Sequence, residues 1–144
     1  MNIFWVLFGF RGRRNRAKFW LVLLLTPTLM WLLSILFFGA MLDVDALALG
    51  SINVLVFVIV AWIVFANSAK RLHDMNLSGW WAVLFYAFSW VSLPVVMMTV
   101  ESHGLILTIG ILSLAIVVIM GAQPGTVGPN KYGPDPLAKL AKAS

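Results

Sequence analysis

The spacing of the charged residues constrains the fold of this chain more than any other feature of its sequence. Four stretches carry no Asp, Glu, Lys or Arg, at 19–42, 46–69, 75–100 and 102–130, and they hold 24, 24, 26 and 29 residues. A helix needs about 20 mainly apolar residues to cross a bilayer, at about 1.5 Å of rise per residue. Each stretch is therefore long enough for one membrane-spanning helix and too short for two.

The composition also indicates a membrane protein. Apolar residues make up 62% of the 144 positions and charged residues 10%, against about 25% charged in a typical soluble domain. A domain of this length cannot hide so much apolar surface from water, so lipid must surround most of it. We therefore predict an all-α integral membrane protein, a single domain (1–144) that forms a bundle of four transmembrane helices. The helices are expected near 19–41, 51–69, 80–100 and 105–121, followed by a cytoplasmic tail at 122–144.

The first ten residues are apolar but do not have the pattern of a signal peptide. In a signal peptide the positive charges precede the apolar stretch, whereas here they follow it, in FRGRRNRAK. Ten residues of helix are also too short to cross a bilayer. We therefore expect a short N-terminal interfacial segment, with Phe4, Trp5, Phe8 and Phe10 at the membrane surface.

Two prolines fall inside predicted spans, Pro27 in the first and Pro94 in the third. Membrane helices tolerate proline where neighbouring helices cover the carbonyl group that it frees. We interpret both prolines as packing kinks rather than functional hinges.

All lysines and arginines fall on one side of this four-helix arrangement. Five precede the first span, two lie between the second and third, and three follow the fourth, whereas the opposite loops carry only acids and a histidine. The positive-inside rule then places both termini in the cytoplasm. The cations are Arg11, Arg13, Arg14, Arg16, Lys18, Lys70, Arg71, Lys131, Lys139 and Lys142, and the opposite loops hold Asp43, Asp45, Glu101 and His103.

Three polar segments on the cytoplasmic side hold the candidate site residues. The first is the basic run FRGRRNRAKFW, in which Arg11, Arg13, Arg14 and Arg16 are candidates for binding lipid phosphates. Its simpler interpretation is a topology signal whose long side chains extend toward the headgroups. The alternative is a specific headgroup or partner site, because a guanidinium group can bind phosphate through two parallel hydrogen bonds.

The second segment, 67–81, continues the second predicted helix beyond the apolar stretch. One face of that continuation would carry Asn67, Lys70, Arg71 and Asp74. Lys70 is expected to pair with Asp74 one turn later. His73 and Asp74 are weak catalytic candidates, because neighbours on a helix point about 100° apart. A hydrogen-bonded interfacial turn, with Ser78 capping the next helix, is the favoured interpretation.

The third segment, 123–136, alternates prolines with glycines and is predicted to form consecutive tight turns. We expect an ordered Pro/Gly-rich C-terminal tail that folds back onto the other two segments. Asn130, Tyr132 and Asp135 should make the contacts. Asp135 is the only acid of the tail, so an arginine is its expected partner.

The segments FRGRRNRAKFW, AKRLHDMNLSGWW and QPGTVGPNKYGPDP resemble the signature segments of a bacterial inner-membrane family catalogued as domain of unknown function 805 (DUF805). The resemblance covers most of the chain, residues 9–136, in the family's order. It implies a small four-helix protein of the bacterial inner (plasma) membrane, and it implies no activity because the family has none established. The family usually has an acid just before the FW of the first segment, where this chain has Lys18, so an ion pair made there in relatives does not carry over.

Several other kinds of site lack the residues they need. The chain has no cysteine, and His73 and His103 fall on opposite sides of the membrane, so no metal site is expected. No nucleotide-binding loop or nucleophile motif occurs, and no cofactor is expected. The predicted spans hold no ionisable residue, which disfavours ion-coupled transport. Because the cations lie beside apolar spans, the net charge of +5 indicates anionic lipid rather than nucleic acid.

The favoured hypothesis is a non-catalytic membrane protein whose basic cytoplasmic face binds anionic lipid, a partner protein or a second copy of the chain. The candidate binding residues are Arg11, Arg13, Arg14, Arg16, Lys70, Arg71, Asn130, Tyr132 and Asp135. The alternative is a membrane enzyme that acts on a lipid headgroup or another phosphate-bearing substrate, using His73 with Asp74 or Asp135. A small transporter subunit is a second alternative. A carboxylate close to His73 in an open cleft would favour the enzyme.

Overall fold

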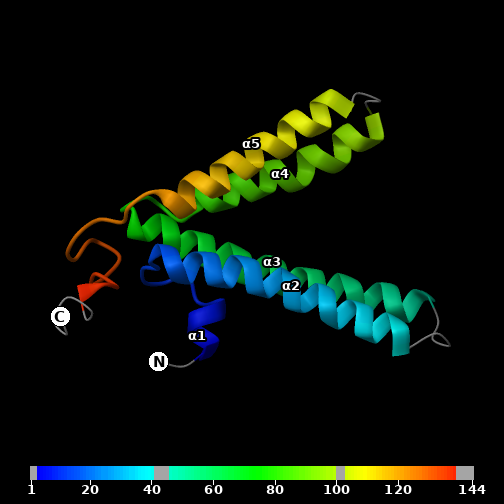
Figure 1. The fold of residues 1–144 in the computed structure, drawn as a ribbon, viewed down its shortest axis with the longest axis horizontal. Coiled ribbons are helices and arrows are strands. Elements are labelled where there is room, and N and C mark those ends of the chain that lie inside the picture. The colour runs from blue at the N-terminus through cyan, green and yellow to red at the C-terminus, as the bar shows by residue number, and fades with distance from the viewer. Residues whose placement is uncertain (1–2, 41–45, 100–102, 139–144) are drawn as a thin grey trace.

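The computed structural model describes residues 3–40, 46–99 and 103–138, and the described chain forms five helices (Figure 1). They are α1 (Ile3–Phe8), α2 (Arg16–Ala40), α3 (Ala46–Asp74), α4 (Trp80–Thr99) and α5 (His103–Ala122). Figure 1 shows two helical hairpins, α2–α3 and α4–α5, that lie together at one end and diverge toward the other. Helix α1 and the segment after α5 lie at the joined end, which we call the junction.

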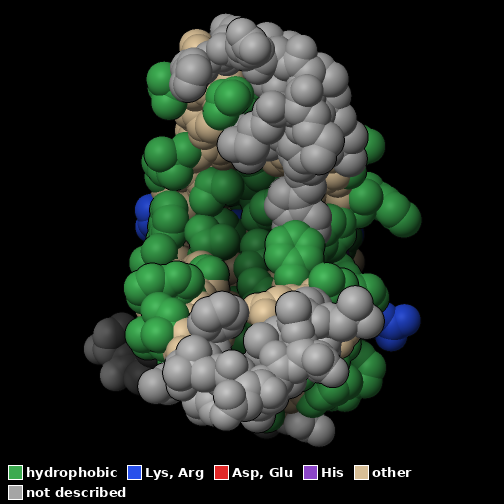
Figure 2. Space-filling model, turned by 90° about the vertical axis from the view of Figure 1, so that its right-hand side faces the viewer, with side chains coloured by type: hydrophobic (Ala, Val, Ile, Leu, Met, Phe, Trp, Pro, Cys, Tyr) green, Lys and Arg blue, Asp and Glu red, His purple; other side chains and the backbone are tan. Residues whose placement is uncertain are grey.

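Three of these helices are long and apolar enough to cross a membrane, at Arg16–Ile35, Ser51–Asp74 and Gly104–Ala122, and α4 adds a shorter apolar stretch at Trp80–Ser89. Large apolar side chains along them are exposed. Figure 2, seen from the ends of the hairpins away from the junction, shows hydrophobic side chains over the described surface, with Lys or Arg only at its margins. An apolar surface of this extent needs lipid as its solvent. The prediction of an all-helical membrane protein is confirmed at this level.

The positions of the helices agree with the charge spacing. Helices α2 and α4 continue through Pro27 and Pro94. Helix α3 extends beyond the apolar stretch to Asp74, as the second polar segment suggested. Several predicted features lie outside the described residues: the loop residues Asp43, Asp45 and Glu101, and the end of the tail, 139–144.

Local signals in the sequence fix the helix ends at the junction. Asn15 Oδ1 accepts a hydrogen bond from the Lys18 amide at 3.0 Å, which caps the start of α2. Helix α3 ends in a turn at Asn76, whose φ of 61° is the left-handed conformation common at helix C-termini. Ser78 Oγ accepts from the Trp80 amide at 3.4 Å, so the predicted cap of the following helix is present.

The packed core lies near the junction rather than along the hairpins. Phe19, Leu72, Ala82, Tyr86 and Met120 are buried there, and they come from all four long helices. Beyond this cluster the described side chains of the hairpins are mostly exposed. The fold is therefore fastened at the end that also carries the three polar segments.

Candidate functional site

A buried cluster of ions joins the polar segments at the junction. The Asp74 carboxylate accepts a hydrogen bond from Arg13 Nε at 3.0 Å and another from Arg71 Nη1 at 2.6 Å. The Arg13, Arg71 and Asp74 side chains are 1%, 0% and 5% exposed. Charges buried this deeply are retained only when they are paired and hydrogen-bonded. One acid of α3 thus holds an arginine of its own helix and an arginine that precedes α2.

The prediction that Lys70 pairs with Asp74 is wrong. Lys70 Nζ donates to the Val6 carbonyl at 2.6 Å, in the last turn of α1. A carbonyl at a helix C-terminus has no partner within its helix and carries partial negative charge, so it attracts the lysine. Both carboxylate oxygens of Asp74 are occupied by guanidinium groups.

Arg71 also fastens α3 to the end of α5. Its Nε donates to the Met120 carbonyl at 2.8 Å, its Nη2 donates to the Gln123 carbonyl, and its Nη1 reaches the Arg14 carbonyl at 3.4 Å. The first two carbonyls belong to the C-terminal end of α5, where helical partners are missing. Arg71, on α3, therefore caps the C-terminus of α5 and contacts the segment that precedes α2.

The tail is held against this cluster by Arg13. Arg13 Nη1 donates to the Gly128 carbonyl at 2.5 Å and to the Gly133 carbonyl at 3.5 Å, and Nη2 donates to the Thr126 carbonyl. Each of these carbonyls belongs to the turns that the alternating glycines and prolines predict. A single guanidinium group thus binds the tail and the carboxylate of α3 together.

The tail in turn caps the C-terminus of α3. The Thr126 amide and hydroxyl donate to the Asp74 carbonyl at 2.8 and 3.0 Å, and Asn130 Nδ2 donates to the His73 carbonyl at 2.9 Å. A Cβ atom at Gly125 would lie 2.0 Å from Asp74 Oδ2, so only glycine permits this close approach. Asn130 therefore makes the kind of contact that the sequence predicted.

The prediction of an arginine ion pair for Asp135 is wrong for the part of the chain that the structure describes. Its carboxylate accepts hydrogen bonds from the amides of Leu137 at 2.8 Å and Gly128 at 3.0 Å. These two bonds, in that order, hold the pKa of the Asp135 carboxyl below its usual value, and the charge of Arg13 lowers it further. Backbone amides in the turns of the tail are the partners of Asp135, and the distribution of charges in the sequence does not predict them.

Arg14 and Asn67 connect α1, α2 and α3. Arg14 Nη1 donates to Asn67 Oδ1 at 2.8 Å, and Nη2 donates to the Val6 carbonyl, which Lys70 also contacts. Asn67 Nδ2 donates to the Phe19 carbonyl at 3.0 Å. Arg14 is 5% exposed, and burial lowers the pKa of its guanidinium group. These contacts give hydrogen-bond partners to the buried side chains of Arg14 and Asn67.

The His73 side chain is held by two contacts. Its Nδ1 lies 3.2 Å from the Gly12 carbonyl, and because a carbonyl only accepts, Nδ1 must carry the proton. Its ring stacks on Tyr132 of the tail, with centroids 3.8 Å apart and planes 9° apart. Gly12 has a φ of 96°, which favours glycine at this turn. The contact with Tyr132 agrees with the sequence prediction.

A cavity of about 640 Å³ opens beside this histidine. Three parts of the chain line it: the segment before α2, the helices α3 and α4 with the turn between them, and the tail. Its lining residues include Phe10, Phe65, His73, Ser78, Trp80 and Tyr132. The walls are thus largely aromatic, with a small number of polar groups, as is usual for small-molecule sites.

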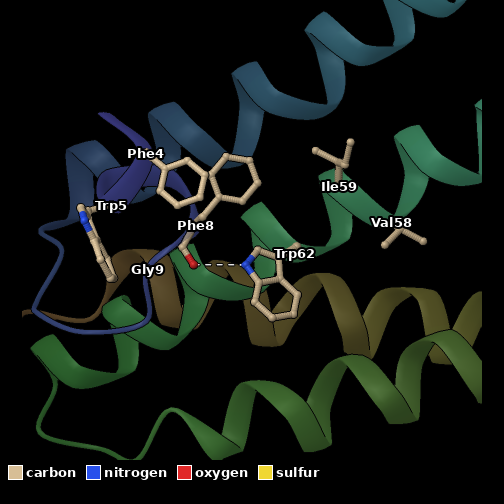
Figure 3. Close-up of a pocket in the computed structure, with 7 residues that line it drawn as sticks. All are labelled: Phe4, Trp5, Phe8, Gly9, Val58, Ile59 and Trp62. Carbon is tan, nitrogen blue, oxygen red and sulfur yellow. Dashed lines mark hydrogen bonds between the residues drawn. The ribbon is translucent and has the colours of Figure 1, made fainter. Parts of the chain in front are cut away.

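A second cavity, of about 400 Å³, lies between α1 and α3 and differs in character. Figure 3 shows Phe4, Phe8, Val58 and Trp62 among the residues that line it, with Trp62 Nε1 donating to the Phe8 carbonyl. That bond is 3.1 Å long. The lining offers no charged side chain. This groove positions α1 but supplies no group for chemistry.

The geometry gives no support to acid–base catalysis by His73. The Asp74 carboxylate is buried between two arginines, and both Asp135 oxygens accept amide hydrogen bonds within the tail. Within residues 3–40, 46–99 and 103–138, no group of three His, Cys, Asp or Glu side chains gathers as a metal site would require. His73 is therefore placed as a packing or ligand-binding group.

The predicted site residues fall into two groups. Arg13, Arg14, Lys70 and Arg71 have buried side chains that are occupied by protein acceptors. Arg11 and Arg16 are exposed, as are Lys18 and Lys131. The tail residues Asn130, Tyr132 and Asp135 are half-buried. The structure thus brings the three segments together, but it divides their cations between the interior and the surface.

The fold and the junction define a small helical membrane protein whose three polar segments close over the meeting point of two hairpins. The chain belongs to the family described as protein of unknown function (DUF805), whose model matches residues 7–134. It is 31% identical to the inner membrane protein YhaH of Escherichia coli strain K12 over 129 residues, 89% of this chain and 87% of that protein. It is 33% identical to the uncharacterized protein YiiR of the same strain over 135 residues, 90% and 86% of the two chains. No solved structure matches the chain.

Sequence reasoning missed Gly125 and Thr126 as functional parts of the junction, and it missed the pairing of Arg13 with Asp74. The alternation of prolines and glycines in the tail was the only signal for Gly125 and Thr126. No local signal marks the third, because its two residues are 61 positions apart.

Proposed function

We propose that this protein crosses the bacterial inner membrane four times, with both termini in the cytoplasm, and that the surface of its junction binds anionic lipid headgroups without catalysing a reaction. The four uncharged stretches and the one-sided distribution of cations support the topology. The inner-membrane relative supports the compartment.

The observation that carries the binding proposal is the division of the cations. Arg13, Arg14, Lys70 and Arg71 are used inside the junction, yet Arg11, Arg16, Lys18 and Lys131 remain exposed around it. Among the residues that the structure describes, neither acid at the junction forms an ion pair with any of these four. These exposed cations are therefore available to a negative partner from outside the chain.

Phospholipid headgroups can be that partner because they lie where an apolar helix leaves the bilayer. Each Lys or Arg near an anionic surface contributes about 1 kcal/mol of attraction. Three of these four exposed cations then amount to about 3 kcal/mol, which is about a 10²-fold preference for anionic over zwitterionic lipid. A fixed arrangement of guanidinium groups adds geometric selectivity that lysine does not supply.

The test replaces three exposed cations, in the variant Arg11→Gln/Arg16→Gln/Lys131→Gln. The protein is purified in mild detergent, and its retained lipids are identified by native mass spectrometry. We expect the wild type to retain anionic lipid in preference to zwitterionic lipid, and the variant to lose this preference.

The matched variant Arg11→Lys/Arg16→Lys keeps the charge, and a partial loss there would show that the guanidinium shape matters. Because these side chains are exposed, the variants should elute as folded protein. An unchanged lipid preference in the glutamine variant would refute the proposal. A variant that retains its lipid but loses a co-purifying protein would identify the surface as a protein-binding site instead.

The topology has its own test. A reporter fused after Ser144 should be active in the cytoplasm, and one inserted at Asp45 should be active outside it. A cytoplasmic signal from the insertion at Asp45 would contradict the four-span topology and with it the common side of the cations.

A further inference from the structure

We propose that the cavity beside His73 is the lipid pocket of the junction, and that it holds the glycerophosphate and the upper part of one acyl chain of an anionic phospholipid. This inference rests on the proposed function and specifies where the bound lipid is seated. It is carried by the lining of the cavity, by the way in which His73 is held and by the exposed aromatic residues at its mouth.

His73 is arranged so that one ring nitrogen stays available. Nδ1 is occupied by the Gly12 carbonyl at 3.2 Å, and the ring face is covered by Tyr132 at 3.8 Å. A Cβ atom at position 79 would come within 2.9 Å of His73 Nε2, so Gly79 leaves that nitrogen uncovered. Because Nδ1 carries the proton, Nε2 is an acceptor, and it can accept a hydrogen bond from a hydroxyl of the lipid headgroup.

Ser78 supplies a second polar group on the same wall. Its Oγ accepts the Trp80 amide hydrogen bond at 3.4 Å, so the hydroxyl proton remains free to donate to a ligand oxygen. Lys131 lies close to this wall, with Nζ 5.0 Å from the centroid of the Tyr132 ring. His73 and Ser78 therefore place an acceptor and a hydroxyl donor in the lining of one cavity, and the Lys131 ammonium group lies over Tyr132, another lining residue. These groups suit the hydroxyls and the phosphate of an anionic headgroup.

The rest of the cavity suits a hydrocarbon chain. Phe10, Phe65 and Val83 contribute apolar walls, and a volume of about 640 Å³ lies in the range of sites that hold small molecules. Trp80, which lines the cavity, is 73% exposed, and its neighbour Trp81 is 60% exposed. Tryptophan is enriched at the level where acyl chains meet headgroups, and Trp80 and Trp81 begin α4 at the junction. The cavity therefore opens at the depth where one lipid presents both parts.

The test uses a photoactivatable lipid with a diazirine in its acyl chain, in vesicles that contain the full-length protein. One preparation carries this chain on phosphatidylglycerol and the other on phosphatidylcholine. Labelled peptides are then identified by mass spectrometry. We expect phosphatidylglycerol to label the peptides of Phe65, Trp80 and Tyr132 severalfold more than phosphatidylcholine does.

The variant Val83→Trp fills the cavity and should reduce this labelling severalfold. Its matched control, Val58→Trp, fills the wholly apolar groove between α1 and α3 and should leave the labelling unchanged (Figure 3). Gly79→Ala places a Cβ atom 2.9 Å from His73 Nε2, so it blocks or displaces that nitrogen and should reduce the preference for phosphatidylglycerol even if the cavity stays open. This second variant keeps the proposal testable if Val83→Trp does not fold.

The outcomes separate this inference from the proposed function. Labelling outside the cavity, with the anionic preference of the retained lipids intact, would overturn the pocket and leave the proposed function standing. Equal labelling of the cavity by both lipids would overturn the pocket as an anionic site. If the wild-type protein retained anionic and zwitterionic lipid equally, both the pocket and the proposed function would be overturned.

Discussion

Replacing Asp74 by asparagine removes the one carboxylate that the buried guanidinium groups of Arg13 and Arg71 share. Removing one partner of a buried ion pair costs about 3–5 kcal/mol, because the other charge is left without compensation. Each guanidinium group keeps three backbone carbonyl acceptors, so the lower end of that range applies. We expect Asp74→Asn to reduce the free energy of unfolding by about 3 kcal/mol, which is about 10²-fold in the unfolding equilibrium.

The assay is reversible unfolding in mixed micelles with increasing SDS, followed by the fluorescence of the 7 tryptophans. Asp135→Asn is the matched control, since that carboxylate accepts hydrogen bonds from amides of its own tail and forms no pair with a buried guanidinium group. The double variant Arg13→Gln/Asp74→Asn should lose less than the sum of the two single losses, because both changes break the same pair. A loss below about 1 kcal/mol for Asp74→Asn, which is the size expected of a solvated surface pair, would refute the buried cluster.

Three further predictions address other contacts. Gly121→Ala would place a Cβ atom 2.3 Å from Trp20 Cζ2 and should cost about 1–3 kcal/mol in the same unfolding assay, whereas Gly110→Ala on the same helix meets nothing within 4 Å and should not. Asn67→Ala should cost about 2 kcal/mol, because it removes one acceptor of the buried Arg14 guanidinium group and a donor to the Phe19 carbonyl. The lowered pKa of the Asp135 carboxyl stabilises the tail above its unfolded pKa of about 3.9, and this stability should be lost as pH falls through the folded value. Proteolysis of the tail at decreasing pH tests this, and an equal acid transition in Asp135→Asn would contradict it.

Charge spacing predicted the helices well because it reports a single physical requirement, the exclusion of charge from hydrocarbon. The helix ends could also be predicted from the sequence, because a capping residue acts over a short distance. Ser78 accepts a hydrogen bond from the amide two residues later. The partners of the charged groups could not be predicted from the sequence. Lys70 and Arg71 both lie within one turn of Asp74, and the choice between them depends on where the α1 carbonyl and Arg13 arrive in space.

The same limit explains why the sequence showed one basic face where the structure has two sets of cations. Composition cannot tell an arginine whose acceptors are backbone carbonyls from an arginine that faces solvent. Arg13 and Arg71 become structural only because the tail and the end of α5 bring carbonyl groups to them. The candidate site therefore depended on contacts between segments far apart in the sequence, which residue types alone do not determine.

The chain direction gives a physical reason for cations inside the junction. Helices α1, α3 and α5 all end there, so carbonyl groups that have no partner within their own helix gather in one place. Lys70 and Arg14 meet the end of α1, and Arg71 meets the end of α5. The end of α3 is met by neutral donors of the tail instead. Four buried cations can therefore lie beside one acid, because carbonyl groups at the ends of α1 and α5 and in the tail accept their remaining hydrogen bonds.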